Sequence, residues 1–171
     1  MPNGIIDGLF KNTLYIRISS DLLSVRLVDQ NCTYEDLPLI ALAPDAKGRR
    51  RVVGVGSEAQ TAHSTGKGTV TIHNGFDHPR SCIGDSEIAE ATLRHFIRRV
   101  TNRLTLLRPT VVIHPLEKIE GGLTEIECRG LHDLAERAGA GRVYVWAGRV
   151  LDDQELTSLQ FPPSAGRLGW G

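Results

Sequence analysis

The 171-residue sequence predicts an α/β fold. Three observations support this prediction. Residues 14–28 alternate or cluster β-forming side chains around a short polar turn, which is typical of a hairpin. From Asp85 the apolar residues recur every three or four positions, which indicates an amphipathic helix. Residues 110–146 then run strand, helix, strand, which predicts a right-handed parallel unit.

In the first half, β-branched and apolar runs between turn residues predict strands, and one N-terminal segment has helical spacing despite its two glycines. The turn at 44–48 contains Pro, Asp and Gly, which supply turn geometry at low cost. In chain order we predict a weak helix at 4–10, strands at 14–18, 22–28, 38–43 and 51–55, a short helix at 57–63 and a strand at 69–73.

In the second half, the helix from residue 85 has Asp85 or Ser86 as its cap. Thr124 and Glu127 have the spacing of a capping box, so a further helix is expected to begin there and to end at the glycines of 139–141. Strands are predicted at 110–113 and 142–146. From Asp152 onward, two prolines, several glycines and little periodicity predict a loose tail.

The composition excludes several classes of protein. Lys and Arg together number 20, as do Asp and Glu, so no global field attracts nucleic acid or an anionic membrane. The three cysteines are an odd number at wide spacing, which argues against a disulfide framework and favours a reducing, cytoplasmic compartment. No apolar run is long enough to span a bilayer and no secretory signal is evident, so any membrane contact is expected to be peripheral.

Four segments resemble the MreB family of bacterial actin-like rod-shape proteins. Residues 92–100, TLRHFIRRV, resemble the family helix MLRYFIRKV, and residues 123–144 resemble its segment ITEVERRAVIEAAEQAGAREVYLI. Residues 8–16 and 53–59 resemble its entry into the first strand and its VGxxA turn. The resemblance covers roughly residues 8–150. It implies the first half of an actin/Hsp70-type ATPase-like fold: a mixed sheet with flanking helices.

The same resemblance implies how the chain is divided. Residues 1–151 would form the actin-fold half, with a small inserted subdomain at about 30–85. Residues 152–171 would be the C-terminal tail.

The chain departs from the family where nucleotide is held. The family hairpin DLGTAN, whose acid serves the metal and whose Gly-Thr turn approaches phosphate, is matched here by residues 17–22. Its acid is replaced by Arg17 and its glycine by Ser19, which is followed by Ser20 and Asp21. The family EEP is replaced by residues 147–149, and the second phosphate loop is absent. We therefore expect no nucleotide binding at this degenerate loop, and no cofactor.

Three candidates for chemistry remain in the sequence. Glu127 matches a family position near the attacking water, so it is a weak catalytic candidate, although capping with Thr124 already explains its spacing. Arg17 could meet a phosphate, but a salt-bridged strand residue is the favoured interpretation. Several potential metal ligands lie close together in sequence but fit no established zinc spacing, so no metal is predicted: His63, His73, His78 and Cys82.

The N-terminal segment is apolar where a free terminus should be polar. Its apolar side chains, Ile5, Ile6, Leu9 and Phe10, are expected either to pack on the domain or to contact a partner or membrane. Packing or partner contact is favoured, because only Lys11 is present to meet anionic lipid.

Two functions follow from these features. The favoured one is a non-catalytic, truncated MreB-like protein that binds filaments or cell-shape components in the cytoplasm or at the inner face of the membrane. The alternative is a residual or split ATPase completed by a partner chain. Nucleic acid is not an expected partner.

Overall fold

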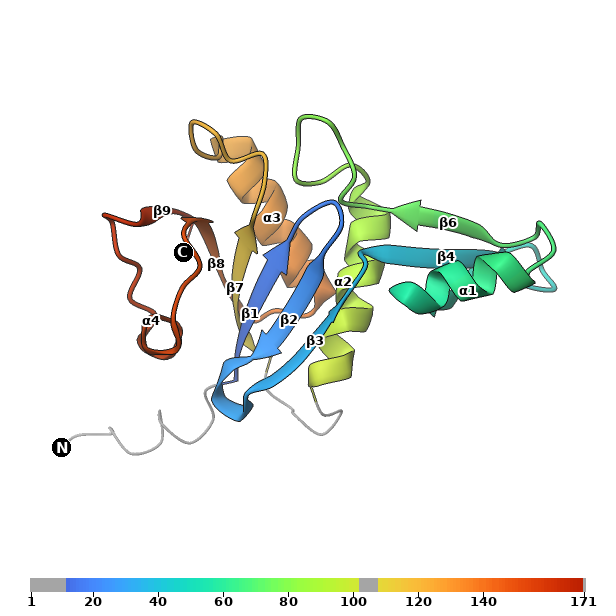
Figure 1. Ribbon diagram of the computed structural model, residues 1–171, viewed down its shortest axis with the longest axis horizontal. Coiled ribbons are helices and arrows are strands. Elements are labelled where there is room, and N and C mark those ends of the chain that lie inside the picture. The colour runs from blue at the N-terminus through green and yellow to red at the C-terminus, as the bar shows by residue number, and fades with distance from the viewer. Residues whose placement is uncertain (1–11, 102–107, 171) are drawn as a thin grey trace.

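The computed structural model describes residues 12–101 and 108–170, which form two sheets flanked by helices (Figure 1). The larger sheet has six strands in the order β3-β2-β1-β7-β8-β9, and the smaller has three in the order β5-β4-β6. The strands are β1 Thr13–Ile18, β2 Leu23–Leu27, β3 Cys32–Asp36, β4 Leu39–Pro44, β5 Arg50–Val55, β6 Thr71–Asn74, β7 Thr110–Pro115, β8 Arg142–Gly148 and β9 Gly166–Trp170. The helices are the 3-10 turn η1 Val28–Gln30, α1 Ser57–Thr65, α2 Ser86–Val100, α3 Glu125–Ala138 and α4 Asp153–Ser158.

The larger sheet is mixed. β1 pairs antiparallel with β2 and parallel with β7, where Thr13 lies opposite Thr110. β7 and β8 are also parallel, and α3 connects them along the chain. β9 returns antiparallel to β8, so it forms one edge of the sheet while β3 forms the other.

Successive side chains along the central strands point to opposite faces of this sheet, as the period of two requires. On β1, Leu14 and Ile16 join the main core with α2 and α3, whereas Tyr15 joins a smaller core on the opposite face. That smaller core contains Trp146 of β8 and Leu156 of α4. The sheet is therefore covered on both sides, by α2 and α3 on one and by the α4 region on the other.

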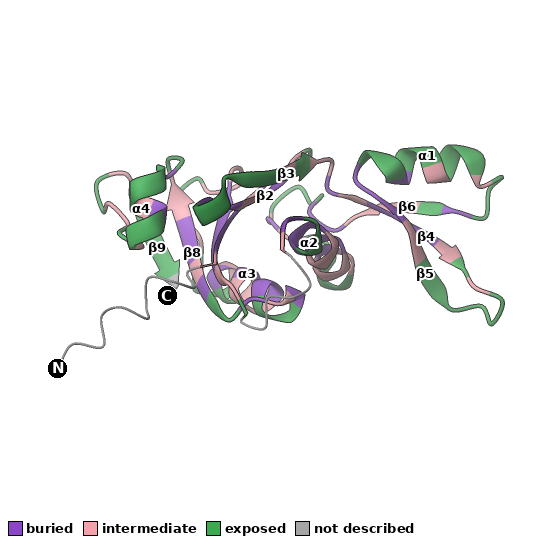
Figure 2. Cartoon of the chain, turned by 90° about the horizontal axis from the view of Figure 1, so that it is seen from below, coloured by how far each residue is buried: buried purple, intermediate pink, exposed green. Residues whose placement is uncertain are grey.

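The smaller sheet lies with α1 at one end of the molecule (Figure 2). Ala59 of α1 packs on Ala41 of β4 in a small apolar cluster. Gly54 of β5 permits this close approach, since a Cβ there would lie 2.8 Å from the Glu58 carbonyl oxygen. This sheet and α1 span residues 39–74, inside the segment in which an inserted subdomain was predicted.

Most of the elements predicted within the described residues are confirmed, and the helix predicted at 4–10 lies outside them. The first hairpin is present as β1 and β2. Asp85 caps α2, accepting hydrogen bonds from the N–H groups of Glu87 and Ile88. β3 was not predicted as a strand. Among the described residues, no helix is both long and apolar enough to cross a membrane.

The expectation of a loose tail after Asp152 is wrong, although the predicted domain limits themselves stay a prediction. Residues 153–158 form α4, capped by Asp152, and residues 166–170 form β9. Tertiary contacts order this segment: Leu156 is fully buried, and the ring of Phe161 lies 5.7 Å from that of Trp146. Gly166 is needed beside this indole, because a Cβ there would lie 2.5 Å from Trp146 Cζ2.

Candidate functional site

The turn between β1 and β2 is where the resemblance places the degenerate phosphate loop. The Ser19 N–H donates to the Leu22 carbonyl at 2.8 Å, which closes the turn. The Ser19 hydroxyl donates to Asp21 Oδ1 at 2.6 Å. Ser19 is buried and Asp21 is exposed, so the serine stabilises the turn from within.

Arg17 points across the hairpin toward β3. Its Nη2 donates to Ser24 Oγ at 3.2 Å and to Glu35 Oε2 at 3.0 Å. The guanidinium therefore forms a partly exposed ion pair along the β1–β2–β3 surface. Such pairs contribute at most about 1 kcal/mol to stability.

Ser20 presents both of its donors to one carboxylate. Its N–H lies 2.7 Å from Glu117 Oε1, and its hydroxyl lies 3.3 Å from Glu117 Oε2. Glu117 follows the carboxyl end of β7 and also pairs with Lys118 at 3.0 Å. Burial by itself would raise the pKa of Glu117, but the hydrogen bonds from Lys118 and Ser20 outweigh it and hold that pKa below its usual value. Glu117 is thus an anion bound at the turn.

Three further hydrogen bonds fix the segments around this contact. The Leu116 N–H donates to the Ile18 carbonyl at 2.8 Å, and Asn74 Nδ2 donates to the Ser20 carbonyl at 2.7 Å. Cys82 Sγ lies 3.6 Å from the Glu117 carbonyl oxygen, with the thiol as donor. Burial raises the pKa of Cys82 to about 11, so this cysteine stays a neutral thiol. The turn, the end of β7 and the segment after β6 are thereby joined.

Glu127 forms the capping box that its spacing predicts. Its Oε2 accepts hydrogen bonds from the N–H of Thr124 at 2.9 Å and from its hydroxyl at 2.8 Å. The Glu127 N–H donates in turn to Thr124 Oγ1 at 3.2 Å. This carboxylate is therefore committed to the start of α3.

Replacing Thr124 with Ala is expected to lower the free energy of unfolding by about 0.5 to 2 kcal/mol, because the Glu127 N–H at the start of α3 loses its acceptor. Glu127→Ala should act in the same direction. Urea denaturation monitored by circular dichroism measures both effects. Arg129→Ala, an exposed change on the same helix, should stay within about 0.5 kcal/mol. Unchanged stability in both cap variants would contradict the capping role.

A groove with a volume of about 230 Å³ lies between α2 and α3. Ile126, on its rim, has 84% of its surface exposed, the highest exposure among the large apolar residues of the described chain. Gly130 leaves part of the wall open, since nothing lies closer than 3.8 Å to the Cβ it lacks. The groove is lined by Ser81, Cys82, Ile83, Ser86, Glu90, Ile126, Glu127, Gly130, Leu131, Asp133, Leu134 and Arg137.

Each of the four potential metal ligands noted in the sequence contacts a different neighbouring group. His63 Nδ1 lies 2.7 Å from the Val70 carbonyl oxygen, His73 Nε2 lies 2.9 Å from Thr71 Oγ1, His78 Nδ1 accepts from the Arg80 N–H at 3.1 Å, and Cys82 contacts Glu117.

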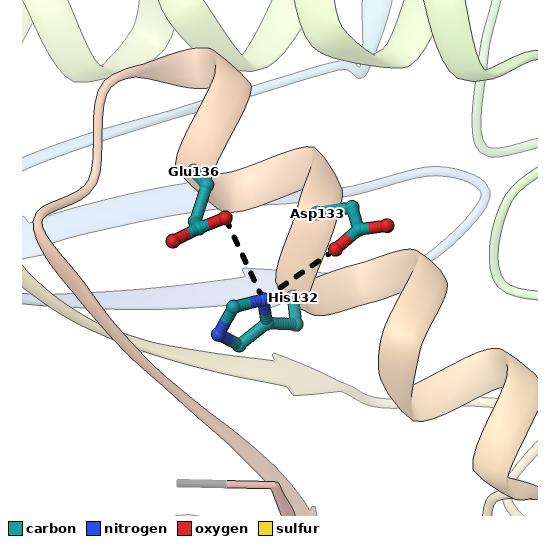
Figure 3. Close-up of side chains that lie close together, drawn as sticks. All are labelled: His132, Asp133 and Glu136. Atoms are coloured by element: carbon teal, nitrogen blue, oxygen red, sulfur yellow. Dashed lines mark ion pairs between the residues drawn. The ribbon is translucent and has the colours of Figure 1, made fainter.

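A different trio, His132, Asp133 and Glu136 on α3, has ligand atoms within 4.8 Å of one another (Figure 3). His132 Nδ1 lies 3.6 Å from Asp133 and 3.9 Å from Glu136. Glu136 is exposed, and neighbours of this kind are common on helix surfaces, so the trio alone defines no metal centre.

The sequence does not indicate the role of one buried histidine. His114 Nδ1 lies 2.6 Å from the Tyr15 hydroxyl, and its Nε2 lies 2.9 Å from the Gly148 carbonyl oxygen. Because a carbonyl only accepts, the proton lies on Nε2 and Tyr15 donates to Nδ1. Burial lowers the pKa of His114 to about 4, with a smaller contribution from Arg17. His114 is therefore a neutral link between β1, β7 and β8.

The predicted partner or membrane contact, Ile5, Ile6, Leu9 and Phe10, lies outside the described residues.

Comparison with known proteins places the chain among actin-like proteins. It is similar to MreB5 of Spiroplasma citri bound to AMPPNP, with a TM-score of 0.61, 18% identity and coverage of 79% of this chain and 38% of that one. It is also similar to a non-polymerising A278D mutant of MamK bound to AMPPNP, with a TM-score of 0.59, 16% identity and coverage of 81% and 42%. The mixed sheet with its flanking helices is therefore an actin-type fold, of which this chain carries a part.

The sequence comparisons indicate one family within the actin-like proteins. The MreB/Mbl protein family model matches residues 24–151. The cell shape-determining protein MreB of Haemophilus influenzae is 28% identical over 142 residues, and that of Escherichia coli K12 is 24% identical over 139. These matches cover 82% and 81% of this chain, which spans about 39% of the length of both relatives. The chain belongs to the MreB/Mbl family.

Proposed function

We propose that this chain is a non-catalytic, MreB-like actin-fold protein that acts with the cell-shape cytoskeleton by binding filaments or other cell-shape components. It would work in the cytoplasm or at the inner face of the membrane. The observation that carries the proposal is the open α2–α3 groove beside the exposed Ile126, because an exposed apolar patch of this kind usually marks an interface.

The surroundings of the groove favour a protein partner. Its wall combines apolar side chains of α3, such as Leu131 and Leu134, with Ile83 of the segment before α2 and with the small Gly130. Glu90, Glu127 and Asp133 outnumber Arg137 among its charged residues, so its rim favours an apolar segment flanked by basic residues. The apolar N-terminal residues Leu9 and Phe10 are proposed as a second part of the contact.

The non-catalytic part of the proposal rests on the β1–β2 turn. The structural relatives named above are bound to AMPPNP. In this chain the Ser20 donors are engaged by Glu117, and Arg17 is paired with Glu35. Glu127, the weak catalytic candidate, is occupied in its capping box. The alternative, a split ATPase, would require ATP turnover when this chain is combined with a partner.

Adding this protein to polymerising MreB at an equimolar ratio is expected to reduce the MreB that sediments. A filament grows through repeated head-to-tail contacts, and a partner that spans about 39% of a subunit would block or loosen them. Ile126→Gln should weaken the effect roughly tenfold, as loss of an apolar contact that becomes buried in an interface does. Leu9→Ser with Phe10→Ser should also weaken it.

The matched control is Glu125→Gln, which changes the exposed neighbour of Ile126 on the same helix and should behave as the native chain. Unchanged MreB sedimentation, or sedimentation of the pure protein by itself, would contradict the proposal.

A further inference from the structure

A carboxylate from a distant part of the chain is bound at the β1–β2 turn. A single residue, Ser20, directs its N–H and its hydroxyl at the two oxygens of the Glu117 carboxylate, at 2.7 and 3.3 Å. The two residues are 97 positions apart in the chain, so tertiary structure creates this contact. Turns that direct backbone N–H groups at an acceptor are a common protein device for binding anions, and here one N–H and one hydroxyl do so.

The charge around the contact suits an anion. Lys118 Nζ lies 3.0 Å from Glu117 Oε1, and the pKa of Glu117 is below its usual value, so the carboxylate is ionised at neutral pH. A backbone N–H, a hydroxyl and an ammonium group are also the donors that recognise phosphate oxygens, since carboxylate and phosphate accept the same charge-assisted hydrogen bonds.

The carboxylate is held in place by the backbone of its own segment. The Leu116 N–H is bound to the Ile18 carbonyl at 2.8 Å, and the Glu117 carbonyl accepts from the Cys82 thiol at 3.6 Å. On the other side of the turn, Asn74 is bound to the Ser20 carbonyl at 2.7 Å. Both partners of the Ser20–Glu117 contact are therefore fixed by neighbouring hydrogen bonds.

We infer that Glu117 is a built-in anion that occupies the oxyanion-binding position of the β1–β2 turn and excludes phosphate groups from it. This inference rests on the non-catalytic part of the proposed function, which already uses the Ser20–Glu117 contact, and deepens it by naming what that contact excludes. It also assigns a role to a residue outside the degenerate loop. The donors are the N–H and hydroxyl of Ser20 in the turn, and the carboxylate that occupies them belongs to Glu117, which follows β7.

The test measures binding of inorganic tripolyphosphate by calorimetry and by the chemical shift of the Ser20 amide. The native chain should show no saturable shift at millimolar concentration. Glu117→Ala should bind with a saturable shift of the Ser20 amide and an affinity at least about tenfold higher, because the turn no longer has to release a competing carboxylate. Glu117→Gln keeps an acceptor oxygen and should lie between them.

The matched control is Glu120→Ala, which removes one exposed negative charge from the same loop and should behave as the native chain. An equal gain in Glu120→Ala would overturn the inference, since the effect would then come from net charge. Tripolyphosphate binding at Ser20 by the native chain would overturn it, as would no gain in a folded Glu117→Ala. If Glu117→Ala fails to fold, a gain in Glu117→Gln supports the inference and its absence overturns it. None of these outcomes depends on MreB sedimentation.

Discussion

Replacing Trp146 with Ala is expected to lower the free energy of unfolding by about 3 to 5 kcal/mol, as truncation of a large buried aromatic side chain does. Trp146 is completely buried on the face of the sheet covered by α4. Its Nε1 donates to the Arg149 carbonyl at 2.8 Å, and its ring packs against Phe161. The variant therefore loses apolar burial, a hydrogen bond and the surface on which residues 153–170 fold.

Two measurements check this expectation. Urea denaturation gives the loss of stability, and hydrogen exchange should show protection falling most in residues 153–170. Val150→Ala, a change at a half-exposed side chain in the same region, should stay within about 0.5 kcal/mol. A loss below about 1 kcal/mol for Trp146→Ala would contradict the central role assigned to this side chain.

Acidification from pH 6.5 to pH 4 is expected to destabilise the protein by roughly 3 kcal/mol through His114 alone. The pKa of His114 is about 4 in the folded chain and near 6.5 in an unfolded one. Between these values the unfolded state binds more protons, so stability falls as the pH falls. The contribution is fully present above pH 6.5 and is lost as the pH approaches 4.

Urea denaturation of His114→Gln across this range tests the assignment. The variant should be less stable at pH 7.5, since the bond to Tyr15 is disturbed, yet its stability should vary less between pH 6.5 and 4. His95 is the matched control, because burial also lowers its pKa, with Arg98 and Arg99 contributing. His95→Gln should flatten the dependence less than His114→Gln. An unaltered pH dependence in His114→Gln would show that another group titrates.

Elements whose signal lies within a few consecutive residues could be predicted from the sequence. α2 has regularly spaced apolar residues and a capping Asp85, and the start of α3 is marked by Thr124 and Glu127. β3 was missed because Cys32–Asp36 is a mostly polar strand at the edge of the sheet. α4 and β9 were missed because one is six residues long and the other contains two glycines, and both depend on contacts with the rest of the fold.

The residues of the candidate site also differ in whether local sequence indicates their role. The altered turn at Ser19 and Ser20 could be recognised from local residues, as could the capping role of Glu127. The contact of Glu117 with Ser20 could not be predicted, because the two residues are distant in the chain and no local pattern indicates that they meet. The exposure of Ile126 was also beyond local patterns, since apolar residues on a helix normally predict the buried face.

The parallel pairing of β1 with β7 has a consequence for synthesis on the ribosome. β1 is made early, but its parallel neighbour begins at Thr110, roughly a hundred residues and 5 to 20 s of translation later. Until then the hairpin of β1 and β2 has one uncovered edge and no β7 to complete the core beneath α2. Such an edge pairs readily with other chains. The nascent chain therefore passes through an interval in which its central strand presents an unpaired edge.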